Sequence, residues 1–173
     1  MSQPVQFWQT KSRYDGAEYD LSHLAPLSIT MQLSGGKSIP LMFRFSYHCC
    51  SDKIGKRDLG TRINENTRPD EERYFCPVRW FMSLKLPSRV KSLETVRLAP
   101  VPGYQWIHTE KVTGISIPWA IWFKVMPGPP GGATVVGVES AYLAASAPKG
   151  GKADTFRFIA EQTRRTGNFY GTP

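Results

Sequence analysis

Apolar and polar residues alternate along several stretches of the chain, and a period of two is typical of a β-strand with one buried face. Residues 27–34 show the pattern first, with Leu, Ile, Met and Leu separated by Ser, Thr, Gln and Ser. Two glycines follow as a tight turn, and residues 41–48 alternate again. We therefore predict a β-hairpin whose second strand carries Arg44 and His48 on the face opposite its apolar residues.

Further strands follow from the same reasoning in the second half of the chain. Residues 119–125 alternate in the same way, and a segment rich in proline and glycine ends that strand. Residues 133–145 form a long apolar run with one charged interruption, Glu139. Residues 156–158 place Arg157 between two phenylalanines, which predicts a short last strand.

Prolines mark where helices are expected. Pro77 opens a stretch through Leu86 that predicts the main helix, and Pro87 then kinks or restarts it. Pro69, followed by three acidic residues, has the composition of another first helical turn. A hairpin, a main helix and then several strands without intervening helices predict an α+β fold. We expect a mostly antiparallel sheet with one main helix packed across it.

The chain of 173 residues is long enough to bury one core of ordinary size. We expect an irregular N-terminal arm over residues 1–26, a single α+β domain over residues 27–160 and a basic C-terminal tail over residues 161–173. No run of about eighteen apolar residues occurs, and the first residues do not resemble a signal peptide. The expected location is therefore the cytoplasm, with no membrane partner.

The excess of positive charge bears on which partners the chain is expected to bind. The chain has 22 lysines and arginines against 14 acidic residues, a formal net charge of +8. Such a surplus attracts polyanions such as nucleic acids, and it also occurs in stable domains that bind none. Residues 49–68 combine cations with two glycines, which predicts an exposed basic loop.

One group of residues predicts chemistry, because alternation places its members on one face of the sheet. A histidine and a carboxylate on that face supply a general acid or base, and neighbouring cations stabilise phosphoryl charge. This combination predicts a metal-independent ribonuclease site. The predicted catalytic residues are His48 and Glu139, and the predicted phosphate-binding residues are Arg44, Arg79 and Arg157, with Lys124 on the same face. A solvated sheet face with salt bridges has the same composition.

The three cysteines, together with His48, are candidate metal ligands. Cys49, Cys50 and Cys76 offer the thiolates that zinc prefers. Adjacent cysteines point in different directions in an extended chain, and they lack the usual ligand spacing. The acids at 70–72 offer a cation site or simply a helix start. We expect reduced cysteines and neither a metal nor another cofactor.

Binding without catalysis is a second prediction from the same composition. Trp106, Trp122 and Tyr142 would stack on bases while the basic loop and tail hold phosphates. Two function classes therefore remain open. The first is a nucleic-acid-binding protein or metal-independent nuclease, for example of a mobile-element or stress system. The second is a non-catalytic module whose basic loop docks an acidic protein partner.

Several short segments carry a resemblance to known proteins. They are Tyr47-His48-Cys49, then Arg79-Trp80 with Ser83 and Leu86-Pro87, then Val138-Glu139-Ser140-Ala141-Tyr142, and finally Phe156-Arg157-Phe158. Over roughly residues 40–160 the chain resembles uncharacterised bacterial proteins, some of which are labelled stationary-phase growth adaptation proteins. The resemblance implies a bacterial or phage-borne accessory protein and no particular activity.

Overall fold

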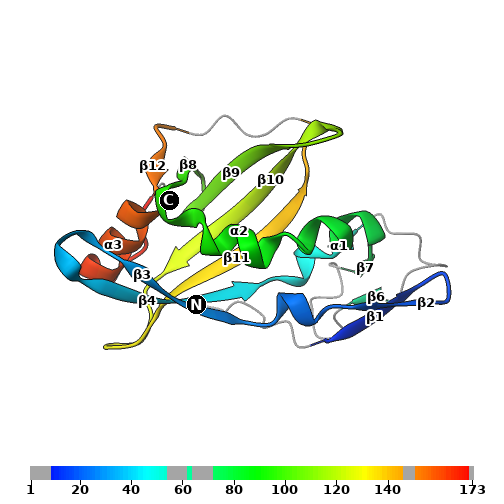
Figure 1. The fold of residues 1–173 in the computed structure, drawn as a ribbon, viewed down its shortest axis with the longest axis horizontal. Coiled ribbons are helices and arrows are strands. Elements are labelled where there is room, and N and C mark those ends of the chain that lie inside the picture. Colours follow the sequence, from blue (N-terminus) through cyan, green and yellow to red (C-terminus); the bar gives the residue numbers. More distant parts are fainter. Residues whose placement is uncertain (1–8, 54–61, 64–71, 146–150, 172–173) are drawn as a thin grey trace.

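A seven-stranded sheet dominates the fold of the protein (Figure 1). The computed structural model describes residues 9–53, 62–63, 72–145 and 151–171. The strands of the large sheet lie in the order β12-β8-β9-β10-β11-β4-β3. They are β3 (Leu27–Gln32), β4 (Ser38–Phe45), β8 (Arg97–Val101), β9 (Gln105–Val112), β10 (Ile115–Met126), β11 (Thr134–Leu143) and β12 (Asp154–Thr155). Neighbours are antiparallel except β4 and β11, which run parallel.

The helices confirm the predicted α+β class. The main helix is bent into α1 (Pro77–Ser83) and α2 (Leu86–Lys91), and each begins with a proline in its first turn. A proline costs nothing there because the first N–H groups of a helix have no intrahelical partner. The helix start predicted at Pro69 lies outside the described residues. No helix in the described part of the chain is long and apolar enough to cross a membrane.

The predicted hairpin of β3 and β4 is confirmed, with matched apolar faces. Leu27 pairs with Phe43 and Met31 pairs with Ile39, so the larger side chains of both strands reach the core. The prediction for its last residues was wrong, because the strand ends at Phe45. His48 lies instead in a 3-10 turn, η3 (Tyr47–Cys49), and is not part of the alternating strand.

The N-terminal segment is not the irregular arm that was predicted. From residue 11 it forms a hairpin of β1 (Lys11–Tyr14) and β2 (Ala17–Asp20), followed by a short turn, η1 (Ser22–Leu24). Asp15 and Gly16 both have positive φ, the conformation of the tightest hairpin turns. Beside it lies a small sheet, in the order β5-β7-β6, of β5 (Ser51–Asp52), β6 (Arg62–Ile63) and β7 (Arg73–Phe75).

The C-terminal segment is a helix where a strand and a tail were predicted. Helix α3 runs from Phe156 to Thr166, and its N-terminus is capped by the Thr155 hydroxyl, which accepts a bond from the Phe158 N–H at 3.3 Å. Its buried positions follow helical spacing and face the sheet; they are Phe156, Ile159, Ala160 and Thr163. The Phe156 ring lies 6.0 Å from that of Phe43, which fixes α3 against the core.

Candidate functional site

The two faces of the large sheet differ in what covers them. One face carries the main core beneath the helices. The other, which we call the second face, carries a small apolar cluster in which every residue lies on a sheet strand or directly after one, so no described helix contributes to it. The buried members are Val101, Ile107, Ala120 and Ala144, and the half-buried members are Ala99, Trp122 and Tyr142. Side chains of β4, β10 and β11 extend this face.

Strand register brings two cations together on the second face. Gly137 on β11 pairs with Arg44 on β4 and with Lys124 on β10, so the three residues form one row across three strands. Neighbouring strands lie about 4.8 Å apart, which places the cations on either side of a position without a side chain. The carboxylate of Glu139 lies over this position. A Cβ atom at Gly137 would lie 2.5 Å from Glu139 Oε1.

A β-bulge accounts for the position of Glu139. Trp122 pairs with Ser140 and its neighbour Phe123 pairs with Val138, so Glu139 is the extra residue on β11. Such an extra residue redirects a side chain, and bulges occur often beside active sites. In this case the carboxylate lies along the strand over Gly137. Alternation alone does not reveal this arrangement.

The Glu139 carboxyl has an unusual electrostatic environment. Burial raises its pKa above the ordinary value, and the positive charge of Lys124 offsets part of that rise. Within the described part of the chain, Glu139 forms neither a hydrogen bond nor an ion pair at contact distance. A half-buried carboxylate without such a partner costs folding free energy, so it is a good candidate for a functional group.

Aromatic side chains lie beside this charged row. Trp122 and Tyr142 are half-buried and pack against the small apolar cluster of this face. The guanidinium of Arg79 reaches the edge of the face from α1 and lies 4.8 Å from the centre of the Tyr142 ring. Arg79 also approaches Asp52 at 3.8 Å, which holds its position. The second face therefore combines stacking surfaces with three cations and one carboxylate.

His48 contacts Arg79 through its backbone carbonyl. The guanidinium of Arg79 donates a hydrogen bond to the His48 carbonyl oxygen at 3.1 Å, and the imidazole packs edge-on against Tyr47 at 4.5 Å. Burial, followed by the charges of Arg73, Arg79 and Lys53, lowers the pKa of His48 to about 4. The imidazole is therefore neutral at pH 7. No hydrogen bond or ion pair joins His48 to Glu139 among the described residues.

The other predicted site residues are divided between the two sides of the sheet. Arg157 lies on α3, where its guanidinium is paired with Glu94, so the alternation that placed it on the same sheet face as Arg44 was wrong. Trp106 was predicted to stack on bases but is only 1% exposed, because its ring stacks on Tyr170. The structure thus brings Arg44, Lys124 and Glu139 together, with Arg79 at the edge.

The three cysteines lie at η3 and at the start of α1. Cys49 and Cys50 are buried, and burial raises the pKa of both thiols, that of Cys50 to about 12. The N–H of Cys76 donates to the Cys50 carbonyl at 2.9 Å, which links α1 to the turn before β5. No group of three metal-binding side chains is found within the described ranges. Residues 54–61 and 64–68 of the predicted basic loop lie outside those ranges.

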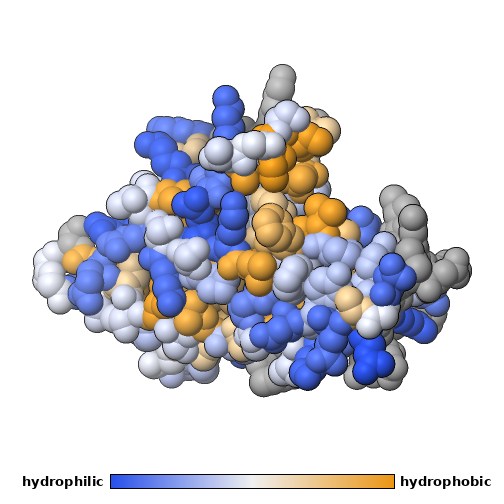
Figure 2. Space-filling view, turned by 45° about the vertical axis from the view of Figure 1, so that its right-hand side comes forward, coloured by the Kyte–Doolittle hydropathy of each residue, from blue (hydrophilic) through white to orange (hydrophobic). Residues whose placement is uncertain are grey.

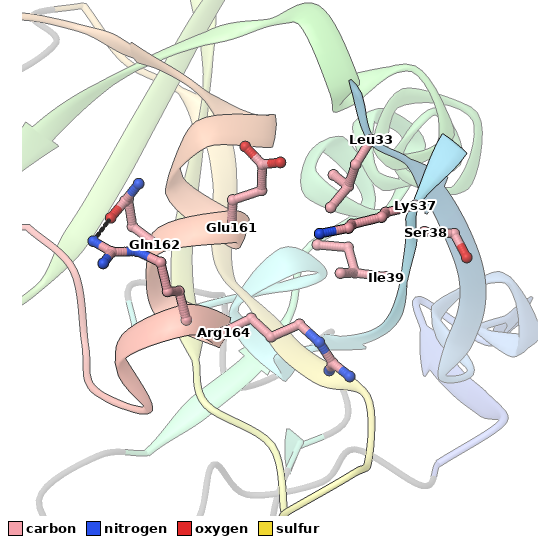
Figure 3. Close-up of a pocket in the computed structure, with 8 residues that line it drawn as sticks. Leu33, Lys37, Ser38, Ile39, Glu161, Gln162 and Arg164 are labelled. Carbon is pink, nitrogen blue, oxygen red and sulfur yellow. Dashed lines mark hydrogen bonds between the residues drawn. The ribbon is translucent and has the colours of Figure 1, made fainter. Parts of the chain in front are cut away.

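A separate recess of roughly 650 Å³ lies between the β3–β4 hairpin and α3 (Figure 3). Leu33 and Ile39 contribute apolar surface, and the Lys37 amine extends toward the helix that carries Glu161. On the helix, the Arg165 guanidinium bonds the Gln162 side-chain oxygen at 2.6 Å. No aromatic side chain lines this recess. It therefore lacks the stacking surfaces of the second face.

Comparison with known proteins gives one match. The model of a family described as the YjaZ family matches residues 11–164, which is most of the chain. No curated protein and no solved structure matches.

Proposed function

The chain belongs to the YjaZ family, and we propose that it binds single-stranded nucleic acid across the second face of its large sheet. The observation that carries this proposal is the arrangement of Trp122 and Tyr142 beside the row of Arg44 and Lys124. Stacking of a base on an aromatic side chain contributes about 1–3 kcal/mol, and it is open only to unpaired bases. Single strands are therefore the favoured ligands.

The cations on this face support contacts to a phosphate backbone. Arg44 and Lys124 flank β11 at a separation of roughly 10 Å, two strand spacings. Arg79, held over the Tyr142 ring, adds a third cation at the edge. The net charge of +8 raises the rate of encounter with any polyanion. Together these features favour a strand that lies across β4, β11 and β10.

Charge reversal on the second face tests the proposal. We expect the double variant Arg44→Glu, Lys124→Glu to weaken binding of a labelled single strand by about tenfold or more, because two phosphate contacts become repulsive. The measurement is fluorescence anisotropy at several salt concentrations, with EDTA present. The double variant Lys85→Glu, Lys91→Glu is the matched control, since it changes the net charge by the same amount and both lysines are exposed on the helical side of the sheet.

The possible outcomes distinguish binding at the second face from attraction by net charge and from no binding at all. Salt-dependent binding by the wild type and by Lys85→Glu, Lys91→Glu, with a loss in Arg44→Glu, Lys124→Glu, supports the proposal. Binding that falls equally in both variants indicates attraction by net charge alone and rejects the second face as the site. Absence of binding to single-stranded RNA and DNA rejects the function.

A second candidate function follows from an exposed apolar stripe on α1. Val78, Phe81 and Leu84 recur at a spacing of three residues and are 60%, 58% and 43% exposed. Figure 2 shows apolar surface near the centre of the molecule, on a view that includes the α1 side. Residues 77–92 contain four cations and no acid. We therefore propose that the stripe docks an acidic amphipathic helix of a partner protein.

Phe81→Glu tests this docking surface. We expect the variant to lose binding of a synthetic amphipathic helix of leucine and glutamate by about tenfold or more, because it removes an apolar anchor and adds repulsion. Its melting temperature should stay close to that of the wild type, since the side chain is exposed. Lys111→Glu on β9 is the control. Failure of the wild type to bind the peptide, or unchanged binding by Phe81→Glu, rejects the surface.

A further inference from the structure

We propose that the second face also cleaves single-stranded RNA, with Glu139 as the general base that activates the ribose 2′-hydroxyl. This inference rests on the proposed function, because it requires the strand to lie across the same face. It assigns a substrate class, RNA, since DNA has no 2′-hydroxyl. It also replaces the predicted pair of His48 and Glu139 with a different group of residues.

The geometry of the row supports this assignment. The Glu139 carboxylate lies over Gly137, which pairs with Arg44 on one side and with Lys124 on the other. A phosphodiester held by those two cations lies directly against the carboxylate. The bulge that directs Glu139 to this position interrupts the regular pairing of β10 and β11, and bulges of this kind occur often beside active sites.

The reaction needs no metal and no redox partner. Glu139 accepts the proton of the 2′-hydroxyl while the 2′-oxygen forms a bond to phosphorus. The bond from phosphorus to the 5′-oxygen breaks, and the leaving oxygen keeps its electron pair and takes a proton from water. The products are a 2′,3′-cyclic phosphate and a 5′-hydroxyl, and Glu139 returns its proton to the solvent. Arg44 and Lys124 stabilise the charge that develops on the phosphoryl oxygens.

The surroundings of Glu139 suit a general base. Burial raises the pKa of its carboxyl, which makes the carboxylate a stronger base than one exposed to solvent. Tyr142 and Trp122 hold the bases and so orient the ribose. Burial, followed by the charges of Arg73, Arg79 and Lys53, disfavours protonation of the His48 imidazole. Proton transfer is assigned to Glu139 because its carboxylate lies over Gly137, in the row of Arg44 and Lys124.

Glu139→Gln is the decisive variant, because it keeps the size of the side chain and removes its basicity. We expect the rate of cleavage of a mixed-sequence single-stranded RNA, in EDTA, to fall by about 100-fold or more, with affinity changed less than about threefold. Products are identified by their cyclic phosphate ends. The same RNA carrying 2′-O-methyl groups should bind and stay intact. The wild-type rate should rise with pH through the raised pKa of Glu139 and then level off.

A second variant covers the case in which Glu139→Gln does not fold. Gly137→Ala places a methyl group 2.5 Å from Glu139 Oε1, so the carboxylate must move away. We expect slower cleavage with binding retained.

Wild-type protein that binds RNA but leaves it intact overturns the inference and leaves the proposed function standing. Equal cleavage by wild type and Glu139→Gln also overturns it, whereas absence of binding overturns both.

Discussion

Replacing Phe43 by alanine is expected to lower the free energy of unfolding by about 4 kcal/mol, within the range measured for buried phenylalanines. Phe43 is fully buried at the point where β3, β4 and β11 meet, opposite Leu27 and Val136. Its ring also lies 6.0 Å from that of Phe156 on α3. The truncation therefore leaves a cavity bordered by rigid strands, which cannot collapse to fill it.

Urea denaturation measures this effect, and the chain offers a matched control. Phe81→Ala removes the same atoms from a side chain that is 58% exposed, and we expect a loss below about 0.5 kcal/mol. The difference between the two variants isolates the contribution of burial. Equal losses would mean that β3 and α3 do not pack on β4 as described.

Acidification from pH 7 to pH 4 is expected to remove about 2 kcal/mol of stability through His48 alone, after allowance for its partial access to solvent. The folded protein lowers the pKa of this imidazole from 6.5 to about 4, first by burial and then through three neighbouring cations. Between these values the unfolded chain binds a proton and the folded chain does not. The stabilisation is complete above pH 6.5 and is lost as the pH falls toward 4.

His48→Gln should remove most of this dependence, since the variant has no titrating group at that position. The measurement is the unfolding free energy at several pH values between 4 and 7, for both proteins. Burial also lowers the pKa of His23, so a smaller slope of the same sign should remain in the variant. An unchanged slope in His48→Gln would show that the imidazole is not held neutral in the folded protein.

Much of the fold was predictable because alternation and prolines report local structure directly. The strands near residues 27–34, 119–125 and 133–145 are confirmed, as is the helix that begins at Pro77. The strand predicted at residues 156–158 is wrong, because three alternating residues fit a strand and the start of an amphipathic helix equally well. The buried positions farther along α3 decide between them.

The site was less predictable, because its residues meet through pairing between distant strands. Arg44 pairs with Gly137 only because β4 runs parallel to β11, and no local pattern specifies that neighbour. The bulge at Glu139 also leaves no mark in the sequence. Alternation did place Arg44 and Lys124 on one face, since both lie within regular strands. It failed for His48, because the chain leaves the strand before reaching it.

The parallel pairing of β4 and β11 also sets the order of events during synthesis. The hairpin of β3 and β4 emerges early from the ribosome, whereas its neighbour β11 emerges much later. Contacts between segments so distant in sequence form slowly, because a long loop must close first. Until β11 is made, the backbone groups on one edge of β4 have no strand partner in the nascent chain. That edge can then associate with other strands. The row of Arg44, Gly137 and Lys124 cannot form until β11 pairs with β4, so no nascent chain that ends before β11 carries the site.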